Sequence, residues 1–269
     1  MVQNSKKKFS FGKNWQHYLA DCYDEERLDS AVSSLKDFLP FDNLKGKIFL
    51  DIGCGSGLFS LAALHLGANK VVSFDVDEQS VVCCQQLKEA IGNPINWEVK
   101  HGSILDTDFI SNLEKADVVY SWGVLHHTGR MWEGIFNSML LIKPSGYLYL
   151  AIYNKFDGIL SSSFWLQVKR FYCRLPKIGQ SFLEALVVMA ELFLCLARFK
   201  NPIRRIKGYK KRRGMSWRRD VSDWLGGYPY EVASPEDIFH FCSKQGLILR
   251  NLTTVNHTGN NQFLFQKML

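Results

Sequence analysis

The chain has 269 residues, a mass of 30.9 kDa and a formal net charge of +7 at pH 7. Hydrophobic residues make up 46% of it and charged residues 22%, which excludes a disordered or fibrous protein and allows one large domain with an insert. Seven cysteines without a CxxC pair argue against a disulfide framework or a zinc ribbon, and the lysine-rich start lacks a secretory apolar segment. We therefore expect a cytoplasmic protein with reduced thiols and no bound metal.

The first part of the chain, residues 1–43, is predicted to be an N-terminal helical arm or lid. Residues 1–13 are polar and basic, and from Trp15 to Leu39 the apolar residues keep helical spacing. Pro40 then ends the helical pattern.

Strands and helices alternate regularly from residue 44 to residue 154. This order is typical of βαβ units in an α/β protein with a parallel sheet and helices on both faces. A turn is predicted at Lys143–Gly146, just before the fifth strand. The predicted strands are 48–52, 70–76, 97–102, 117–122 and 147–152, and the predicted helices are 58–66, 79–91, 109–113 and 131–142.

The segment 155–233 breaks this alternation and is predicted to be a basic helical insert with an acceptor-side segment. Residues 155–219 hold 16 Lys or Arg against three acids, so the positive charge of the chain lies here. The nearly apolar stretch 182–199 is short for a membrane span and contains two glutamates. Three interpretations stay open: a lid over the active site, a homodimer surface, or an interfacial membrane helix in which 182–213 meets an anionic inner membrane face.

The last part, residues 234–269, is predicted to complete the core sheet. Ser234, a proline and two acids form a strong helix start, and the helix is expected to run to Lys244. Residues 247–255 and 262–267 then alternate like two antiparallel strands.

A glycine-rich turn after the first strand suggests a cofactor site. Gly53, Gly55 and Gly57 follow an apolar strand and precede a helix, a geometry that turns backbone amides toward a ligand. The acid Asp51 before the turn suits the cationic S-adenosylmethionine better than a pyrophosphate. Asp75, at the end of the second strand, can accept bonds from two ribose hydroxyls.

Five sequence stretches resemble the class I S-adenosylmethionine-dependent methyltransferases: LDIGCGSG at 50–57, FDVD at 74–77, GSILD at 102–106, VVYSWGVLHHT at 118–128 and KPSG at 143–146. The resemblance implies a Rossmann-like seven-stranded sheet of order 3-2-1-4-5-7-6, with strand 7 antiparallel and helices on both faces. It also implies S-adenosylmethionine as the cofactor. The cofactor-binding residues implied by position are Asp51, Gly53, Gly55, Gly57, Asp75, Val76, Ser103, Ile104, Ser121 and, from the N-terminal arm, Trp15.

The acceptor of the methyl group is expected beyond the carboxyl end of the fourth strand. Gly123 would let the backbone pass close to the cofactor there. His127 or His126 could take a proton from an attacking hydroxyl, since imidazole titrates near neutral pH. Methyl transfer can also proceed by positioning alone. Tyr153 and Asn154 end the fifth strand and are expected at the edge of the acceptor pocket.

The aromatic and glycine-rich segment 217–231 resembles one found in a subgroup related to 3-demethylubiquinone O-methyltransferase. Its Trp224, Tyr228 and Tyr230 are candidates for acceptor contacts, with a structural clamp as the equal alternative. His257 and Asn261, in the loop between the last two strands, could also reach the acceptor.

The sequence thus predicts methyl transfer to a small-molecule, glycan or lipid-linked acceptor, at a hydroxyl. The chain lacks the [DNS]PP[YF] stretch of exocyclic-amine methylases and the Pro-Cys nucleophile of cytosine C5 methylases, so DNA is not an expected partner. Two alternatives stay open. One is an RNA methyltransferase that holds phosphates with the basic insert, and the other is a catalytically silent cofactor-binding regulatory partner.

Overall fold

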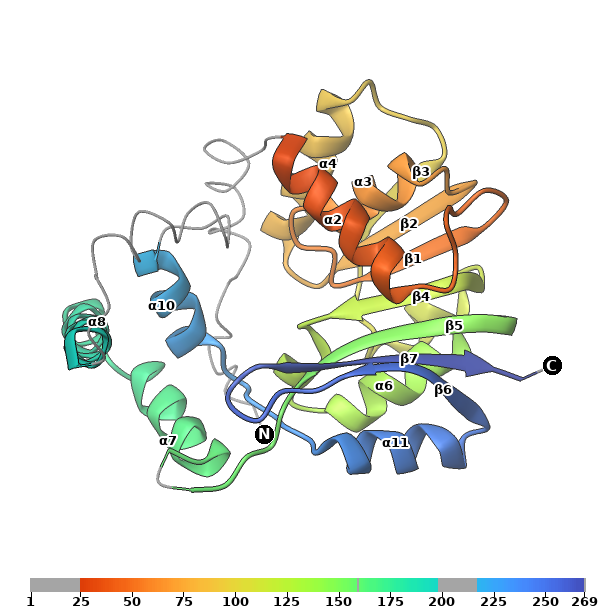
Figure 1. Cartoon of the computed structure of the whole chain (residues 1–269). Helices are drawn as coiled ribbons and strands as arrows, with labels where there is room; N and C mark the ends of the chain where they lie inside the picture. The colour runs from red at the N-terminus through yellow and green to blue at the C-terminus, as the bar shows by residue number, and fades with distance from the viewer. Residues whose placement is uncertain (1–24, 159, 198–216, 269) are drawn as a thin grey trace, which may run out of the picture.

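The computed structural model describes residues 25–158, 160–197 and 217–268 (Figure 1). The predictions for the arm before Glu25, including the cofactor-side role of Trp15, lie outside these residues, as does the basic cluster 204–213.

A seven-stranded sheet forms the centre of the molecule, in the order β3-β2-β1-β4-β5-β7-β6. The first five strands pair in parallel, whereas β7 runs antiparallel to both β5 and β6. The predicted order and the single reversed strand are therefore confirmed. The strands are β1 (Ile48–Ile52), β2 (Lys70–Asp75), β3 (Trp97–His101), β4 (Ala116–Trp122), β5 (Ile142–Tyr153), β6 (Leu247–Thr253) and β7 (Asn260–Lys267).

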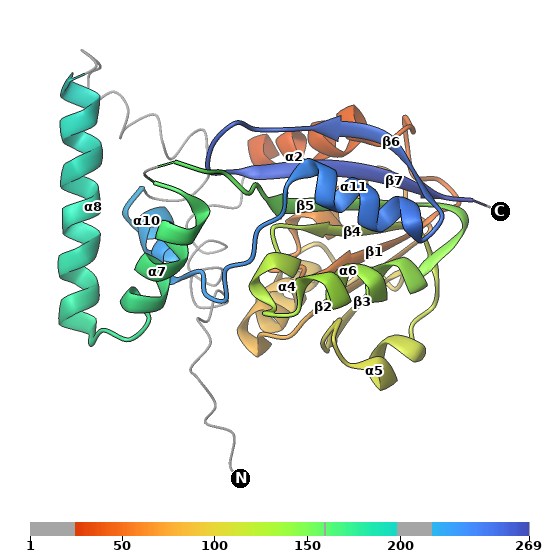
Figure 2. The same cartoon turned by 90° about the horizontal axis from the view of Figure 1, so that it is seen from below.

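Helices cover both faces of this sheet, as predicted. Buried side chains of α2, α3 and α4 pack on one face, and those of α5, α6 and α11 pack on the other (Figures 1 and 2). The helices are α2 (Glu25–Phe38), α3 (Leu58–His65), α4 (Glu78–Ala90), α5 (Thr107–Ser111), the 3-10 turn η1 (Leu125–His127), α6 (Met131–Leu140), α7 (Ser162–Tyr172), α8 (Lys177–Ala197), α10 (Trp217–Gly226) and α11 (Pro235–Lys244).

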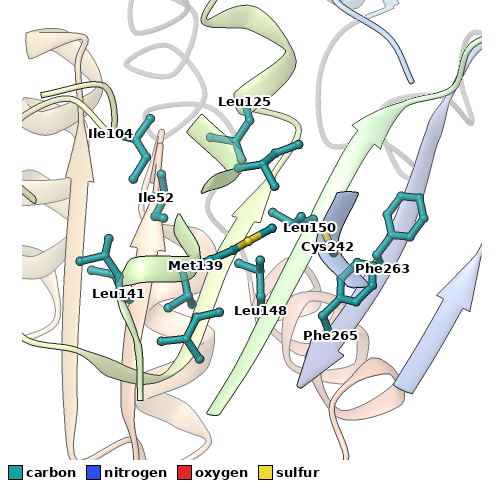
Figure 3. Close-up of a cluster of buried hydrophobic side chains, with 14 of the residues drawn as sticks. Ile52, Ile104, Leu125, Met139, Leu141, Leu148, Leu150, Cys242, Phe263 and Phe265 are labelled. Carbon is teal, nitrogen blue, oxygen red and sulfur yellow. The ribbon is translucent and has the colours of Figure 1, made fainter. Parts of the chain in front are cut away.

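Burial on both faces explains why β1 is an apolar run and not an alternating one. All five of its residues are buried, with Ile52 in the cluster under α6 and Phe49 in the cluster under α2 and α3. Figure 3 shows Ile52 in one cluster with Leu150 of β5 and Phe263 of β7. The C-terminal hairpin therefore shares its core with the central strands.

The predicted helix start at Ser234 is confirmed in detail. The Ser234 hydroxyl accepts the Asp237 amide at 3.1 Å, and the Asp237 carboxylate accepts the Ser234 amide at 3.1 Å, which is a capping box. The α4 helix is capped in the same manner by Asp77, whose carboxylate accepts the Gln79 amide.

The turn predicted at Lys143–Gly146 lies inside β5 as an irregularity, because pairing resumes on both sides of it. Ala116 pairs with Ile142 and Val118 already pairs with Tyr147, so residues 143–146 bulge out of the ladder. The bulge is held by Lys143, whose ammonium donates to Asp117 at 2.9 Å. Strand 5 therefore starts earlier than predicted.

The insert forms a separate helical layer beyond the carboxyl end of β5 (Figures 1 and 2). Its helices α7, α8 and α10 share a small core around Tyr172, Val221 and Leu225. The helix α8, which contains most of the apolar stretch 182–199, lies on the far side of α7 and α10 from the sheet (Figure 2). The helices α7 and α10 thus lie between α8 and the sheet (Figure 2), and the lid interpretation of 182–199 stays a prediction.

Among the helices in the described ranges, none combines the length and apolarity that crossing a bilayer requires.

Candidate active site

The turn from β1 to α3 holds three glycines in the left-handed region, with φ of 73° at Gly53, 53° at Gly55 and 82° at Gly57. A Cβ on Gly53 would lie 2.4 Å from Val124 Cγ1, and a Cβ on Gly57 would lie 2.7 Å from Cys84 Sγ. Two of the glycines thus allow close packing within the protein. The loop after β4, which contains Val124, can pack against the glycine turn only because Gly53 has no side chain.

The Gly53→Ala variant should lose about 2–4 kcal/mol of unfolding free energy, because the left-handed backbone and the clash with Val124 both oppose a side chain. Urea unfolding measures this loss. Gly46→Ala is the matched control, since Gly46 also has φ 73° but nothing within 4 Å of its Cβ position. Adding Val124→Ala should recover part of the loss at Gly53. An equal loss in the Gly46 and Gly53 variants would show that the contact with Val124 is unimportant.

Asp75 lies at the end of β2 and binds the glycine turn. Its Oδ2 accepts the Gly55 amide at 3.1 Å and its Oδ1 accepts the Asp77 amide at 2.9 Å. Burial raises the pKa of Asp75, and the two amides oppose that shift. Each oxygen can accept a further hydrogen bond, so the carboxylate is suited to a vicinal diol. Beside it, Val76 is 59% exposed and offers an apolar surface to a flat ring.

The predicted cofactor contact of Asp51 stays a prediction, and the structure shows what its side chain binds within the protein. Its side chain is buried, and its Oδ2 accepts the Ser60 hydroxyl at 2.5 Å. Ser60 Oγ also lies 2.6 Å from the Ser73 hydroxyl. Burial raises the pKa of Asp51 to about 7, and the nearby charge of Asp75 adds to the shift. The Asp51 carboxyl therefore links β1 to α3 through the Ser60 hydroxyl.

Three other predicted cofactor residues serve the fold with their side chains. Ser103 Oγ accepts the Leu105 amide at 3.1 Å, and the Ile104 side chain is buried in the core. The Ile104 carbonyl accepts the side-chain amide of Asn137 at 2.8 Å, and buried Ser121 donates to the Ile52 carbonyl at 3.3 Å. The cofactor contacts predicted for Ser103, Ile104 and Ser121 stay predictions.

Two histidines lie just after β4 with their tautomers set by backbone groups. His127 Nδ1 lies 2.7 Å from the Pro229 carbonyl, which can only accept, so Nδ1 donates and Nε2 carries the lone pair. His126 Nδ1 accepts the Tyr153 amide at 3.2 Å, so in the neutral ring Nε2 carries the proton. Burial lowers the pKa of His127 to about 4 and that of His126 well below its ordinary value. Both rings are neutral at pH 7.

The segment 224–231, called the clamp segment below, holds this histidine loop in place. The Glu231 amide donates to the His126 carbonyl at 2.9 Å, and the Glu231 carboxylate accepts the Met131 amide at 3.0 Å. Pro229 also packs against Gly129, where a Cβ would lie 3.3 Å from Pro229 Cγ. These contacts are those of a structural clamp.

The predicted aromatic residues stack around the clamp segment. Tyr153 packs on His126 with ring centroids 3.8 Å apart and on Tyr230 with centroids 5.3 Å apart. Trp224 meets Trp165 of α7 edge to face at 4.2 Å. The half-buried Tyr228 lies near Arg170, 6.0 Å from its ring centroid. The acceptor contacts predicted for Trp224, Tyr228 and Tyr230 stay predictions.

No pattern in the sequence singles out Lys169, which is fully buried beside the clamp segment. Its ammonium donates to the Trp224 carbonyl and lies 4.4 Å from the Trp224 ring centroid and 5.0 Å from that of Tyr230. Burial lowers the pKa of Lys169 to about 7. Its charge also lowers the pKa values of His126 and His127, after the larger effect of burial. In a strongly basic insert, a lysine is ordinarily taken as a solvated residue.

Two predicted acceptor residues are engaged with each other. Asn261 Nδ2 donates to Asn154 Oδ1 at 2.9 Å, and Asn261 Oδ1 accepts the Val255 amide at 3.0 Å. Asn154 Nδ2 donates in turn to the Val255 carbonyl at 2.9 Å. These buried amides tie the β6–β7 loop to the end of β5, and the acceptor contacts predicted for Asn154 and Asn261 stay predictions. His257 is exposed on the same loop.

Buried polar atoms without a hydrogen-bond partner border the site. They include Gln79 Oε1 in the first turn of α4, His126 Nε2 and Asn260 Oδ1. Asn260 also places its Nδ2 4.0 Å from the Cβ position of Gly123, whose φ is 78°. Together with Asp75, these groups fit a polar adenosyl ligand beside an acceptor. The described residues contain no group of three His, Cys, Asp or Glu that could hold a metal ion.

Comparison with known proteins agrees with this geometry for the part of the chain that contains the glycine turn and Asp75. Residues 31–150 match the family model of ribosomal protein L11 methyltransferase (PrmA). Ribosomal protein L11 methyltransferase of Haemophilus ducreyi is 36% identical over 109 residues, 40% of this chain and 34% of that protein. The tRNA U34 carboxymethyltransferase of Idiomarina loihiensis is 31% identical over 110 residues, 40% and 33% of the two chains. The chain thus spans about a third of the length of these relatives.

A solved structure covers nearly the whole fold. Magnesium protoporphyrin IX methyltransferase from Synechocystis, with bound S-adenosylhomocysteine, superposes with a TM-score of 0.53 and 16% identity over 95% of this chain and 93% of that one. The finer resemblance to the ubiquinone-related subgroup stays a prediction. The sheet order and the glycine turn with Asp75 agree with these matches. The chain has the fold of the class I S-adenosylmethionine-dependent methyltransferases, and its residues 31–150 are similar to the ribosomal protein L11 methyltransferases.

Proposed function

We propose that this protein transfers the methyl group of S-adenosylmethionine to a hydroxyl of a small-molecule, glycan or lipid-linked acceptor. The observation that carries the proposal is the neutral His127 ring, whose Nδ1 donates to the Pro229 carbonyl and whose Nε2 bears the lone pair. This ring lies at the carboxyl end of β4, where acceptors bind in open α/β sheets.

The cofactor, when bound, supplies a methyl group on a positively charged sulfur. Asp75 would accept the ribose hydroxyls, and the exposed face of Val76 would lie against the adenine. His127 Nε2 would accept the hydroxyl proton as the acceptor oxygen attacks, since a neutral imidazole is available as a base at pH 7. Gly123 would let the acceptor approach, and Tyr153 would line its pocket. Trp224, Tyr228, Tyr230 and His257 are the further candidates for acceptor contacts.

The acceptor class is best tested with labelled S-adenosylmethionine. Phenols, lipid extracts, a ribosomal protein fraction and tRNA are incubated separately, and the labelled product is identified by mass analysis. A methyl ether in a small or lipid-linked product supports the proposal. Label on a protein or RNA, or on nitrogen or carbon, contradicts it. Cofactor binding without any transfer would favour the regulatory alternative.

A tRNA or protein acceptor is the second candidate, because relatives with those names match about 110 residues of the chain and the ribosomal protein L11 methyltransferase family model matches residues 31–150. The part that the family model matches ends before the insert. It therefore includes the glycine turn and Asp75, but it does not indicate which acceptor the insert side would bind. An RNA acceptor predicts that activity falls steeply with salt, through release of counterions.

A lipid-linked acceptor is supported by an exposed apolar stripe on α8. Five large side chains spaced three or four residues apart on this helix are at least 41% exposed: Ile178, Phe182, Leu186, Met189 and Phe193. The surrounding segment 155–219 is strongly basic. We propose that this stripe and the 182–213 region bind an anionic membrane surface, as the protein acts at the inner face of the membrane.

Wild-type protein should therefore sediment with liposomes that contain anionic phospholipid. The double variant Phe182→Glu with Phe193→Glu should weaken binding at least about 100-fold, because each large apolar side chain contributes about 1.5–3 kcal/mol when buried. Ile95→Glu is the control, since Ile95 is 99% exposed on another part of the surface. Wild-type protein that stays in the supernatant would contradict membrane binding. A stripe-dependent dimer in light scattering would instead support the homodimer interpretation.

A further inference from the structure

We propose that Lys169 is a positioning residue, which docks the insert on the clamp segment and thereby sets the tautomer of His127. The proposal rests on the proposed function for its catalytic consequence only, because the tautomer itself can be measured without an acceptor.

The first step is the contact between α7 and the clamp segment. Trp165, Lys169 and Cys173 are spaced four residues apart, so they lie along one side of the helix region. Trp165 packs on Trp224 at 4.2 Å, and Cys173 Sγ lies 3.5 Å from the Gly226 carbonyl. Lys169, between them, donates to the Trp224 carbonyl. This side of the insert therefore packs against the start of the clamp segment.

The second step concerns the buried lysine at the centre of this contact. A fully buried ammonium is costly unless it is hydrogen-bonded and its charge is compensated. Here the carbonyl of Trp224 and the faces of the Trp224 and Tyr230 rings supply that compensation. A cation over the face of an aromatic ring is attracted more strongly when both are shielded from water. The charge of Lys169 thus holds the rings of Trp224 and Tyr230, which flank residues 226–229 in the chain.

The third step leads from the clamp segment to the histidines. Tyr230, held by Lys169, packs on Tyr153, which stacks on His126. Residue 229 supplies the carbonyl that accepts from His127 Nδ1 at 2.7 Å. If the clamp segment shifts, this carbonyl moves and the proton of His127 is no longer held on Nδ1. The Nε2 atom then loses its defined role as the lone-pair nitrogen.

The test uses ¹⁵N-labelled histidine in the full chain, with the variants Lys169→Met and Lys169→Gln. Wild type should show His127 as the Nδ1–H tautomer. In both variants the His127 signals should move toward a mixture of tautomers, more so in Lys169→Met, which has no donor for the Trp224 carbonyl. Arg174→Met is the matched control, because Arg174 lies exposed in the same insert. It should keep the wild-type signals.

Calorimetric cofactor affinity reports folding in the same samples, and it should stay within about twofold, since Lys169 contacts neither the glycine turn nor Asp75. With an acceptor in hand, kcat should fall about 10-fold or more, in the range that a mispositioned base costs. A wild-type tautomer in either folded variant overturns the proposal, and if only one variant folds, that variant decides. A tautomer shift in a protein that transfers no methyl group would overturn the proposed function and leave the positioning role intact.

Discussion

Replacement of Asp75 by asparagine should weaken S-adenosylmethionine binding by about 10²- to 10⁴-fold. The amide keeps the size of the carboxylate but loses the charge and one acceptor oxygen. Either the Gly55 amide or the Asp77 amide then lacks its partner, and a ribose hydroxyl loses a charged acceptor. Hydrogen bonds to charged groups contribute about 1.5–3 kcal/mol each, so two of them account for this range. Titration calorimetry with purified protein measures the affinity directly.

Asp237→Asn provides the matched control for this change. Asp237 also accepts a backbone amide, that of Ser234, but it lies in the first turn of α11, away from the glycine turn. It should lower stability modestly and leave cofactor affinity unchanged. Cofactor affinity within threefold of wild type in Asp75→Asn would remove Asp75 from the binding site.

The His127→Ala variant should lower kcat by about 10²- to 10⁴-fold, the usual contribution of a positioned general base, with little change in cofactor affinity. The ring contributes to the acceptor side, and it contacts Pro229, His126 and Tyr153, none of which belongs to the glycine turn. Single-turnover assays with a saturating cofactor separate this loss from binding. His240→Ala is the control, because His240 is an exposed residue of α11.

The pH dependence gives an independent check on the same residue. Burial lowers the pKa of His127 to about 4, so its lone pair is present throughout the neutral range and is lost as the pH falls through that value. Titration of His127 should therefore cause no change in activity between pH 6 and 8, although imidazole ordinarily titrates in this range. The ring's contribution to stability follows the same direction: it is complete above pH 6.5 and is lost as the pH falls toward 4. Unchanged turnover in His127→Ala would leave positioning of the substrates as the whole mechanism.

Local signals in the sequence were sufficient for most of the sheet. The apolar run at β1, the glycine turn and the capping residues at Ser234 act over a few neighbours along the chain, so their structures follow from the residues themselves. The sheet order came from the resemblance, since strand pairing is not encoded within any one strand. The same local reading missed the bulge at 143–146, because only pairing with β4 shows that the strand continues through it.

The candidate site divides in the same manner. Asp75 and Val76 lie together at one strand end beside the glycine turn, and their contact with the cofactor stays a prediction. Asp51 and Asn154 were named as ligand contacts from their positions, yet their oxygens are engaged with Ser60 and Asn261 from other segments. Position along the chain tells which residues come near a site, whereas their partners decide which are available.

The sequence by itself therefore determined the fold, the class of cofactor and the location of the histidines after β4. Only the tertiary structure decided which nitrogen of His127 carries the proton, because that depends on the carbonyl of Pro229, about a hundred positions away in the chain. It also decided that Lys169, one of many basic residues in the insert, is the one buried beside the clamp segment. Contacts between distant segments form only when the whole chain has packed, so no local sequence pattern could predict them.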